Sequence, residues 1–391
     1  MLRDFDYILV GGGLQNGLIA LSLLYRDPAV RLLLIEKHEK LGGDHTWSFH
    51  ASDVPTGSLT WFEPLVCHRW PTTEIRFPNF RRQMETGYGS ILSNQFHRVI
   101  KERLARSPHG EIRLGTEVSR IDAREVTLED GTTYSAHWVI DSRGPVPQAK
   151  GTGYQKFVGW EVDLAEGRLP RHPVVMDSLV PQRDGYRFVY VLPFSRTRGL
   201  IEDTSFSNSP TLDRTAMRKA IVDYLHDQGW VVGRLIREES GVLPMPWARP
   251  VADRSPQDQV GLLHAGYQGG WFHPATGYSL PIAVRLAQAI ADAHVGEPLE
   301  TVIARMRVEH AGQARFARFL NRLLFAGFEP ADRWNVFERF YRFPADMIER
   351  FYALAITRED QRKLVCGRPP NRFSVRHFVL RHLLPTAIHR A

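Results

Sequence analysis

The sequence predicts an α/β fold with three parts: a βαβ-type domain assembled from segments far apart in the chain, a mostly antiparallel β domain, and a helical C-terminal region. Three observations predict these parts. The chain opens with an apolar run, a glycine-rich turn and a second apolar run. Between Phe157 and Val242 apolar residues recur with a period of two, which is typical of half-buried strands. From residue 297 onward the apolar period is helical.

The first apolar run, Tyr7–Val10, predicts a strand that leads into the turn Gly11–Gly17, and Leu18–Leu24 predicts the helix that follows. A second buried-strand pattern, Val30–Ile35, ends in Glu36. This order predicts a dinucleotide-binding βαβ unit. Glycines let the backbone approach a pyrophosphate, the helix N-terminus faces that anion, and a carboxylate after the second strand accepts a ribose hydroxyl.

We therefore expect Gly11, Gly13, Gly17 and Glu36 to contact the dinucleotide. The turn departs from the GxGxxG pattern, because Asn16 stands at the third glycine position and the glycine comes one residue later. A glycine-rich turn without a ligand is the alternative interpretation. The order of strand, turn, helix, strand and acid favours the dinucleotide.

Later segments are expected to complete this domain. Ser93 precedes a helical pattern, and residues 112–128 indicate strands that continue through a hairpin turn at Asp130–Gly131. The segment Trp138–Gly144 repeats the form of an apolar strand ending in Asp and Gly, and Gly261–Ala265 indicates one more strand. Both strands are expected to return to the first sheet.

A second glycine-rich loop, Gly266–Tyr278, opens the helix predicted over Ile282–Val295. Successive glycine N–H groups before a helix can hold a pyrophosphate or the pyrimidine edge of a flavin, so Gly269, Gly270 and Gly277 are further candidate cofactor contacts. A plain strand-to-helix turn is the alternative.

We expect the following domains: a dinucleotide-binding domain over 1–50, 90–155 and 255–296, a substrate-binding β domain over 51–89 and 156–254, and a helical region over 297–391.

The length of 391 residues is sufficient for two modest globular units with a substantial core. The two cysteines, Cys67 and Cys366, are too distant for a CxxC site and too few for a disulfide framework, which indicates a reducing compartment. No apolar stretch reaches the roughly 18 residues that span a bilayer, and the first residues do not form a signal peptide. Since neither HxxxH nor HExxH occurs, we expect no metal site.

The basic excess of the chain lies near its C-terminal end. Residues 301–391 contain 17 Arg and Lys against 8 Asp and Glu, whereas the whole chain has a net charge of +7. Between Phe316 and Tyr352 arginines alternate with aromatic residues, a mixture that suits a phospholipid surface. A solvated helical bundle explains the pattern equally well. Nucleic acid is not expected as a partner, because no helix-turn-helix, zinc-finger or RNP-type signature occurs.

Several stretches together resemble bacterial lycopene β-cyclases, a family of FAD-dependent carotenoid cyclases. The resemblance runs from the N-terminus to about Tyr352 and is carried by the segments Gly11–Gly17 with Glu36, Gly42–Phe49, Gly159–Val162, Ile201–Thr204, Gly266–Tyr278 and Glu338–Pro344. It implies a glutathione-reductase-type, Rossmann-like FAD-binding domain beside a separate substrate domain. In related folds a motif such as Asp141 with Gly144 contacts the flavin.

The resemblance also implies an isomerase (intramolecular lyase) that converts lycopene to β-carotene through γ-carotene with no net oxidation. FAD would act in its reduced form, with NADPH as the reductant. The other enzymes of carotenoid biosynthesis are candidate partners. Because the substrate is a C40 hydrocarbon, we expect a cytoplasmic protein peripherally associated with the inner (cytoplasmic) membrane, with Arg315–Tyr352 placed on the lipid. Packing of these helices onto the FAD domain is the alternative.

Cyclisation begins with protonation of a terminal alkene and proceeds through carbocations, so the site needs an acid, a base, nearby negative charge and walls that exclude water. The family's acidic motif matches Ile201–Thr204, which makes Glu202 the first candidate for catalysis. Asp203 would be a structural or supporting partner, because a period of two places adjacent side chains on opposite faces of a strand. A solvent-facing acidic turn after an edge strand is the alternative.

Glu161 is a second candidate acid, with a solvent-facing strand residue as its alternative, and His273 is either a proton relay or a residue that shapes the loop beside the flavin. A carboxylic acid with a pKa near 4 protonates an alkene poorly, so burial must raise its pKa or the reduced flavin must supply charge. We hypothesise that anionic reduced flavin stabilises the cation while Glu202 transfers the proton. The competing functions are a FAD-dependent monooxygenase, a prenyl reductase, and a non-catalytic flavin or carotenoid carrier.

Overall fold

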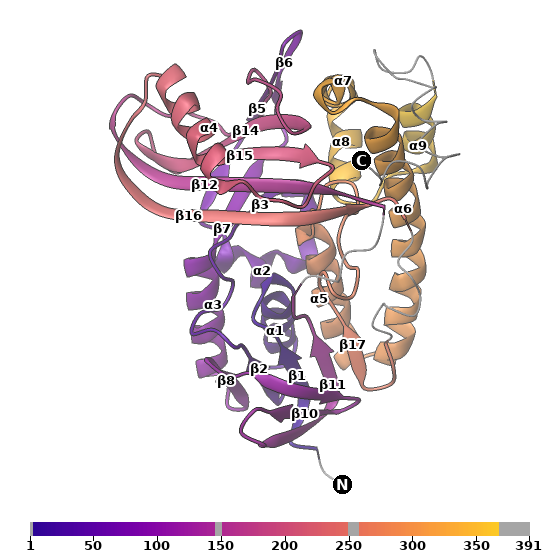
Figure 1. Cartoon of the computed structure of the whole chain (residues 1–391). Coiled ribbons are helices and arrows are strands. Elements are labelled where there is room, and N and C mark those ends of the chain that lie inside the picture. The colour runs from indigo at the N-terminus through magenta and orange to yellow at the C-terminus, as the bar shows by residue number, and fades with distance from the viewer. Residues whose placement is uncertain (1–2, 145–150, 249–257, 367–391) are drawn as a thin grey trace, which may run out of the picture.

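The computed structural model describes residues 3–144, 151–248 and 258–366. Figure 1 shows a domain around a mainly parallel sheet at the N-terminal end, a large antiparallel sheet stacked beyond it, and a set of C-terminal helices along one side of both. The predicted three-part α/β architecture is confirmed.

The first sheet has the order β8-β2-β1-β11-β10-β9, with β17 paired to β11. Strands β8, β2, β1, β11 and β17 are parallel, whereas β10 and β9 extend the sheet as an antiparallel meander. The two segments expected to return to this sheet therefore do so. The strands are β1 (Phe5–Val10), β2 (Leu32–Ile35), β8 (Gly110–Arg113), β9 (Val118–Asp122), β10 (Glu125–Leu128), β11 (Thr133–Asp141) and β17 (Leu262–His264).

Three helices cover this sheet: α1 (Leu14–Arg26), α3 (Ser93–Arg106) and α5 (Leu280–His294). The strand residues of β1 and β2 are almost entirely buried, as expected for parallel strands with both faces covered. Helix α1 packs closely against α3 at Gly17, where a Cβ atom would lie 2.2 Å from the ring of Phe96.

The second sheet has the order β16-β12-β15-β14-β13-β5-β6, and α4 (Arg214–Asp227) packs against β12 and β15. Strand β15 is central in this sheet, between β12 and β14, and residues 202 and 203 lie in its middle. The alternative of an acidic turn after an edge strand is therefore wrong. The strands are β5 (Thr73–Phe77), β6 (Phe80–Met84), β12 (Thr152–Glu166), β13 (Val174–Asp177), β14 (Tyr186–Pro193), β15 (Arg198–Ser207) and β16 (Val231–Pro246).

A small sheet of β3 (Thr46–His50), β7 (Tyr88–Leu92) and β4 (His68–Trp70) lies between the two larger ones. After β3 the chain makes four short helical segments: η1 (Ala51–Asp53), η2 (Thr56–Ser58), α2 (Leu59–Phe62) and η3 (Glu63–Leu65). Thr46 of β3 contacts the second sheet, because its hydroxyl donates a hydrogen bond of 3.1 Å to Glu239 of β16.

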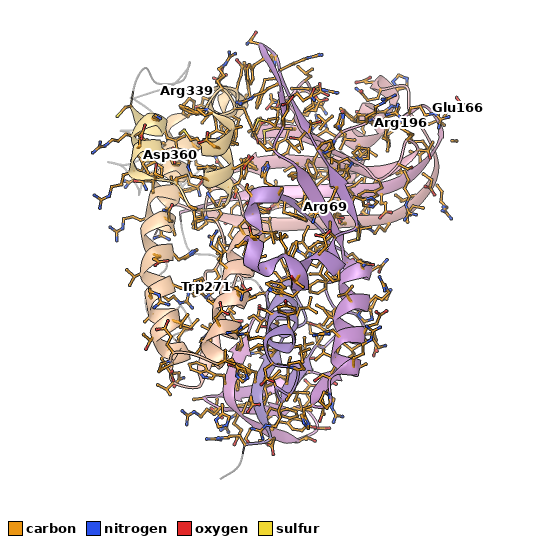
Figure 2. The ribbon with its side chains drawn as sticks, turned by 180° about the vertical axis from the view of Figure 1, so that it is seen from behind. Arg69, Glu166, Arg196, Trp271, Arg339 and Asp360 are labelled. Atoms are coloured by element: carbon orange, nitrogen blue, oxygen red, sulfur yellow. The ribbon has the colours of Figure 1, made fainter. Side chains whose placement is uncertain are left out.

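The C-terminal region consists of α6 (Leu299–Gly327), η5 (Pro330–Asp332), α7 (Trp334–Phe340), α8 (Ala345–Tyr352) and α9 (Arg358–Val365). Helix α6 runs along both domains (Figure 1). Figure 2 labels Trp271 beside α6, and Arg339 and Asp360 on the short helices at its other end. The guanidinium of Arg307 on α6 lies 4.2 Å from the ring of Trp271, which fixes the helix to the first domain. The predicted helical region also includes 367–391, which lie outside the described residues.

Candidate active site

A cavity of about 530 Å³ lies between the large antiparallel sheet and the C-terminal helices. Strands β14 and β15 form one wall, α6 to α9 form the opposite wall, and the loop before α5 closes one end. The lining is predominantly aromatic and aliphatic, and among the described residues Glu202 is the one carboxylic acid in it. Such a volume and lining are typical of small-molecule sites.

Glu202 and Asp203 point to opposite faces of β15, as the period of two predicts. Asp203 is buried away from the cavity, and its Oδ1 accepts a hydrogen bond of 2.6 Å from the Nε of buried Arg187. It is therefore held in an ion pair within the sheet. The Oε1 of Glu202 accepts a hydrogen bond of 2.8 Å from the hydroxyl of Thr204, and within residues 3–144, 151–248 and 258–366 no arginine or lysine forms an ion pair with it.

Glu202 shares its side of the sheet with a second carboxyl group, that of Glu239 on β16. The two residues flank Gly159 of β12, where a Cβ atom would lie 3.3 Å from the Cβ of Glu202 and 3.2 Å from the Cγ of Glu239. The missing side chain leaves room for the carboxyls to meet. Burial, and then the charge of Glu239, raise the pKa of Glu202 to about 8.

Burial raises the pKa of Glu239, and this shift is opposed by the guanidinium of Arg237. The Nη1 of Arg237 donates a hydrogen bond of 2.6 Å to Oε2 of Glu239, which also accepts one of 3.1 Å from the hydroxyl of Thr46. Because Arg237 binds Glu239 and not Glu202, we infer that Glu239 carries the charge of the pair and Glu202 the proton. A protonated carboxylic acid thus lies in an apolar cavity near neutral pH.

The glycine-rich turn after β1 has the geometry expected of a dinucleotide site. Gly11 adopts a φ of +95°, and Gly13 caps α1 without a side-chain hydrogen bond to the free N–H groups. A Cβ atom at Gly13 would meet nothing within 4 Å, so the approach to the helix N-terminus is open. Glu36 lies beside the turn, where its Oε2 accepts a hydrogen bond of 2.6 Å from the N–H of Gly12. These residues fit the pyrophosphate and ribose of FAD.

The departure of this turn from GxGxxG has a structural explanation. The Nδ2 of Asn16 donates hydrogen bonds of 2.9 Å to the carbonyl oxygens of Val10 and Gly11, so the amide ties the helix to the end of β1. Gly17 serves close packing of α1 against α3 and does not face the open side of the turn.

The other candidate cofactor residues fall into two groups. At Gly144 and Gly270 the φ angle is positive, and a Cβ atom would meet none of the described residues within 4 Å. At Gly269 a Cβ atom would lie 1.9 Å from the carbonyl oxygen of His264, and at Gly277 it would lie 2.9 Å from Leu243. Close packing thus favours glycine at both positions, and at Gly277 a φ of +67° favours it as well. The carboxylate of Asp141 accepts a hydrogen bond of 2.9 Å from the Nε of Arg143.

Comparison with known proteins agrees with these features. The sequence model of the family described as "Lycopene cyclase protein" matches residues 6–376 of this chain. A lycopene beta-cyclase from Pseudescherichia vulneris is 43% identical over 93% of this chain and 94% of that protein, and one from Pantoea ananas is 42% identical over 95% and 96%. The chain belongs to the lycopene cyclase family. Lycopene beta-cyclases are intramolecular lyases, so this family member is an isomerase-type enzyme.

Solved structures of low sequence identity share the fold of this cyclase family member. A geranylgeranyl bacteriochlorophyll reductase-like protein from Thermoplasma acidophilum has a TM-score of 0.60 and 14% identity, covering 97% of this chain and 98% of that one. A p-nitrophenol 4-monooxygenase from Pseudomonas putida has a TM-score of 0.60 and 17% identity, covering 90% and 99%. The fold is thus that of the FAD-dependent reductases and monooxygenases.

Glu161 does not reach the cavity of this cyclase family member. It is buried, and its carboxylate accepts hydrogen bonds of 2.9 Å from the Nε of Arg198 and 2.7 Å from the Nε of Arg237. The alternative of a solvent-facing strand residue is wrong, because neighbouring strands supply two arginines that cover this carboxylate. Arg237 also donates a hydrogen bond to Glu239, so Glu161 and Glu239 share this arginine.

His273 shapes the loop before α5. Its Nδ1 accepts a hydrogen bond of 3.0 Å from the N–H of Ala275, and its Nε2 pairs with the carbonyl oxygen of Phe351 at 2.9 Å. Both ring nitrogens are thus used by backbone groups, and burial lowers the pKa of His273 to about 3. It therefore stays neutral and joins the loop to α8.

Two features of the site escaped the sequence interpretation: Glu239 and Asp53. The Oδ2 of Asp53 accepts hydrogen bonds of 2.7 Å from the hydroxyl of Tyr278 and 2.8 Å from the N–H of His50. Both of these partners line the cavity. The spacing of Asp53 three residues after His50 is the only signal in the sequence, and it is typical of capping rather than of catalysis.

Tyrosine pairs complete the polar lining. The hydroxyls of Tyr88 and Tyr190 lie 2.7 Å apart, and those of Tyr341 and Tyr352 lie 2.6 Å apart. The four rings present π faces that can attract a cation. Among the described residues no cluster of three or more His, Cys, Asp or Glu side chains is placed to hold a metal ion.

Proposed function

We propose that this protein is a lycopene β-cyclase: it cyclises the ψ end groups of lycopene to β-ionone rings, giving β-carotene through γ-carotene without net oxidation. The observation that carries the proposal is a carboxylic acid, Glu202, in a predominantly aromatic and aliphatic cavity of a lycopene cyclase family member. Its pKa of about 8 keeps it protonated near neutral pH, which an acid that protonates an alkene requires.

In this mechanism the proton of Glu202 adds to the terminal double bond of the ψ end group and leaves a tertiary cation at the neighbouring carbon. The electron pair of the internal alkene attacks that carbon and closes the ring. The resulting ring cation then loses a proton from an adjacent carbon, and the C–H electrons form the β double bond. One proton enters and one leaves, so the product has the mass of the substrate.

The walls of the cavity protect these cations. Aromatic and aliphatic side chains from β14, β15 and α6 to α8 exclude water, which would otherwise trap a cation as an alcohol. The rings of Tyr88, Tyr190 and Tyr352 face the same space and stabilise positive charge through their π systems.

FAD would be held by Gly11, Gly13, the N-terminus of α1 and Glu36, with open backbone at Gly144 and Gly270 for the remainder of the cofactor. Bound in its reduced form, with NADPH as the reductant, FAD would supply negative charge that stabilises the cation. The proton transfers in the proposal are performed by side chains of this chain.

We also propose that the enzyme collects lycopene as a peripheral protein of the cytoplasmic face of the inner membrane. In the part of the chain that the structure describes, no helix is long and apolar enough to cross a bilayer. Phe319 of α6 and Val365 of α9 line the cavity and are 44% and 45% exposed. Exposed Arg315 and Arg362 lie on the same two helices, and such basic and apolar mixtures favour anionic lipid surfaces.

The proposal is tested by incubating the purified protein anaerobically with FAD, excess NADPH and lycopene in liposomes, and measuring product mass and NADPH consumption. A cyclic product of unchanged mass, with far less than one NADPH consumed per ring, is expected. A gain of two hydrogens would instead indicate a prenyl reductase, and a gain of one oxygen a monooxygenase. Bound but unchanged lycopene would indicate a carrier. Each of these three results would overturn the proposal.

A further inference from the structure

We propose that Tyr278, backed by Asp53, takes up the proton that ring closure releases, so that the proton leaves through a different group from Glu202, which delivered it. The inference rests on the proposed cyclase function and adds a second proton-transfer group to it. It is carried by the position of a buried Tyr–Asp pair in the wall of the cavity.

The pair is built from two distant parts of the chain. Tyr278, in the loop before α5, lines the cavity, and its hydroxyl donates to Oδ2 of Asp53 at 2.7 Å. The same hydroxyl lies 2.8 Å from the carbonyl oxygen of Ser48. Asp53 lies behind the tyrosine, and within the described residues its buried Oδ1 has no hydrogen-bond partner. The carboxyl group therefore keeps a free acceptor position directly behind a tyrosine of the cavity.

A capping role alone does not explain an acid at position 53. The carboxylate accepts the N–H of His50 at the start of η1, and an asparagine would cap this turn equally well. Burying an ionisable carboxyl without an ion-pair partner is costly. The charge of Asp53 must therefore serve something other than the turn.

The surroundings of Asp53 give it affinity for a proton near neutral pH. Burial raises the pKa of Asp53 to about 7, while the hydrogen bonds from Tyr278 and His50 lower it. Arg285 of α5 lowers the pKa at longer range while its guanidinium binds the carbonyl oxygen of Ala353, and Glu349 of α8 raises it. The imidazole of His50 is neutral, because burial lowers its pKa to about 4.

Glu202 and Tyr278 lie at the two ends of one continuous aromatic wall. Tyr190 is the cross-strand neighbour of Glu202, and its hydroxyl meets that of Tyr88. The ring of Tyr88 lies 5.1 Å from that of His50, which lies 5.7 Å from the ring of Tyr352. The ring of Tyr352 in turn lies 6.5 Å from that of Tyr278. Glu202 and Tyr278 thus line the same cavity and are linked by this series of aromatic contacts, so an end group bound there can meet both.

The step balances without a further reactant. The C–H bond of the ring cation breaks, its electrons form the ring double bond, and the proton passes to the hydroxyl oxygen of Tyr278 as the phenolic proton moves to Asp53. Glu202 is then a carboxylate and Asp53 a carboxylic acid. Exchange with water returns both groups to their starting states before the next end group reacts.

The test uses lycopene that carries deuterium at the hydrogen removed in ring closure, with the FAD-loaded enzyme in liposomes. We expect formation of the first cation to limit the rate in the wild type, and hence a deuterium isotope effect near one. In Tyr278→Phe and Asp53→Asn, loss of the acceptor makes proton removal slow. We expect a fall in kcat of roughly 100-fold, an isotope effect above two, and products with the double bond misplaced or with water added.

Tyr224→Phe is the matched control, because its hydroxyl donates to buried Asp177 at 3.0 Å and neither residue lines the cavity. Its isotope effect should stay near one. Wild-type isotope effects in Tyr278→Phe and Asp53→Asn would overturn the inference, whether or not kcat falls. If Asp53→Asn does not fold, Tyr278→Phe decides alone. Failure of the wild type to form rings would instead overturn the proposed function.

Discussion

Glu202 and Glu239 meet across Gly159, the residue of β12 that lies between them and has no side chain to separate them. Glu239 is bound by Arg237, so the proton of the pair stays on Glu202. This relationship gives the cavity an acid that is protonated near neutral pH. The protonation of Glu202 therefore depends on Glu239, which does not line the cavity.

On its alkaline side, the pH dependence of cyclisation should follow the protonation of Glu202. Because an acid catalyst acts in its protonated form, and the pKa of Glu202 is raised to about 8, kcat should fall as the pH rises through about 8. Replacing Glu239 by Gln removes a neighbouring negative charge and should move this fall to lower pH. The profiles of kcat against pH for both proteins check the prediction. Superimposable profiles would contradict the role given to Glu239.

Gly159→Ala tests the space between the two carboxyls. The new methyl group would lie 3.1 to 3.3 Å from Leu200, Glu239 and Glu202, so the neighbours must move apart. We expect a loss of about 1–3 kcal/mol in the free energy of unfolding, together with a lower kcat. Denaturant unfolding and turnover measure both effects. Gly57→Ala, where a Cβ atom meets nothing within 4 Å, is the control.

The two glycines of the first turn should respond differently to substitution by alanine. At Gly17 the methyl group would collide with Phe96 and Ile100, so Gly17→Ala should lower the free energy of unfolding by about 1–3 kcal/mol. At Gly13 the methyl group enters the open space beside the helix N-terminus, so Gly13→Ala should weaken FAD binding with little change in apoprotein stability. Flavin titration and thermal unfolding of the apoproteins separate these outcomes, and equal FAD affinity in Gly13→Ala and the wild type would argue against the cofactor site.

Phe319 and Val365 should matter for membrane-bound substrate. Exchanging both for Ser removes exposed apolar surface at the cavity, so we expect weaker co-sedimentation with anionic vesicles and a higher KM for lycopene in them, at similar kcat. Val308→Ser, on an exposed residue of α6 that does not line the cavity, is the matched control. An unchanged KM in the double variant would place lipid contact elsewhere.

Much of the fold follows from local patterns that the sequence shows directly. The order of strand, glycine turn, helix and acid predicts the β1–α1–β2 unit, and a period of two places Glu202 and Asp203 on opposite faces. These inferences succeed because they depend on residues close together in the chain. The central position of β15 in its sheet depends on its pairing with β12 and β14. A local sequence pattern does not predict which strands pair.

The electrostatics of the site depend on contacts between distant segments. The arginines that cover Glu161 are 37 and 76 residues away in the chain, and Tyr278 is 225 residues from Asp53. Sequence spacing cannot show that Glu161 is ion-paired while Glu202 is not. Similarly, Gly269 has the appearance of a cofactor glycine, yet the carbonyl oxygen of His264 alone excludes a side chain there.

The most direct test of the account is the cyclisation rate of Glu202→Gln with FAD bound. Glutamine keeps the shape and the hydrogen bond from Thr204 but has no acidic proton, so we predict that turnover falls by at least 100-fold while FAD affinity is unchanged. Full turnover by the flavin-loaded variant would contradict the assignment of Glu202 as the acid.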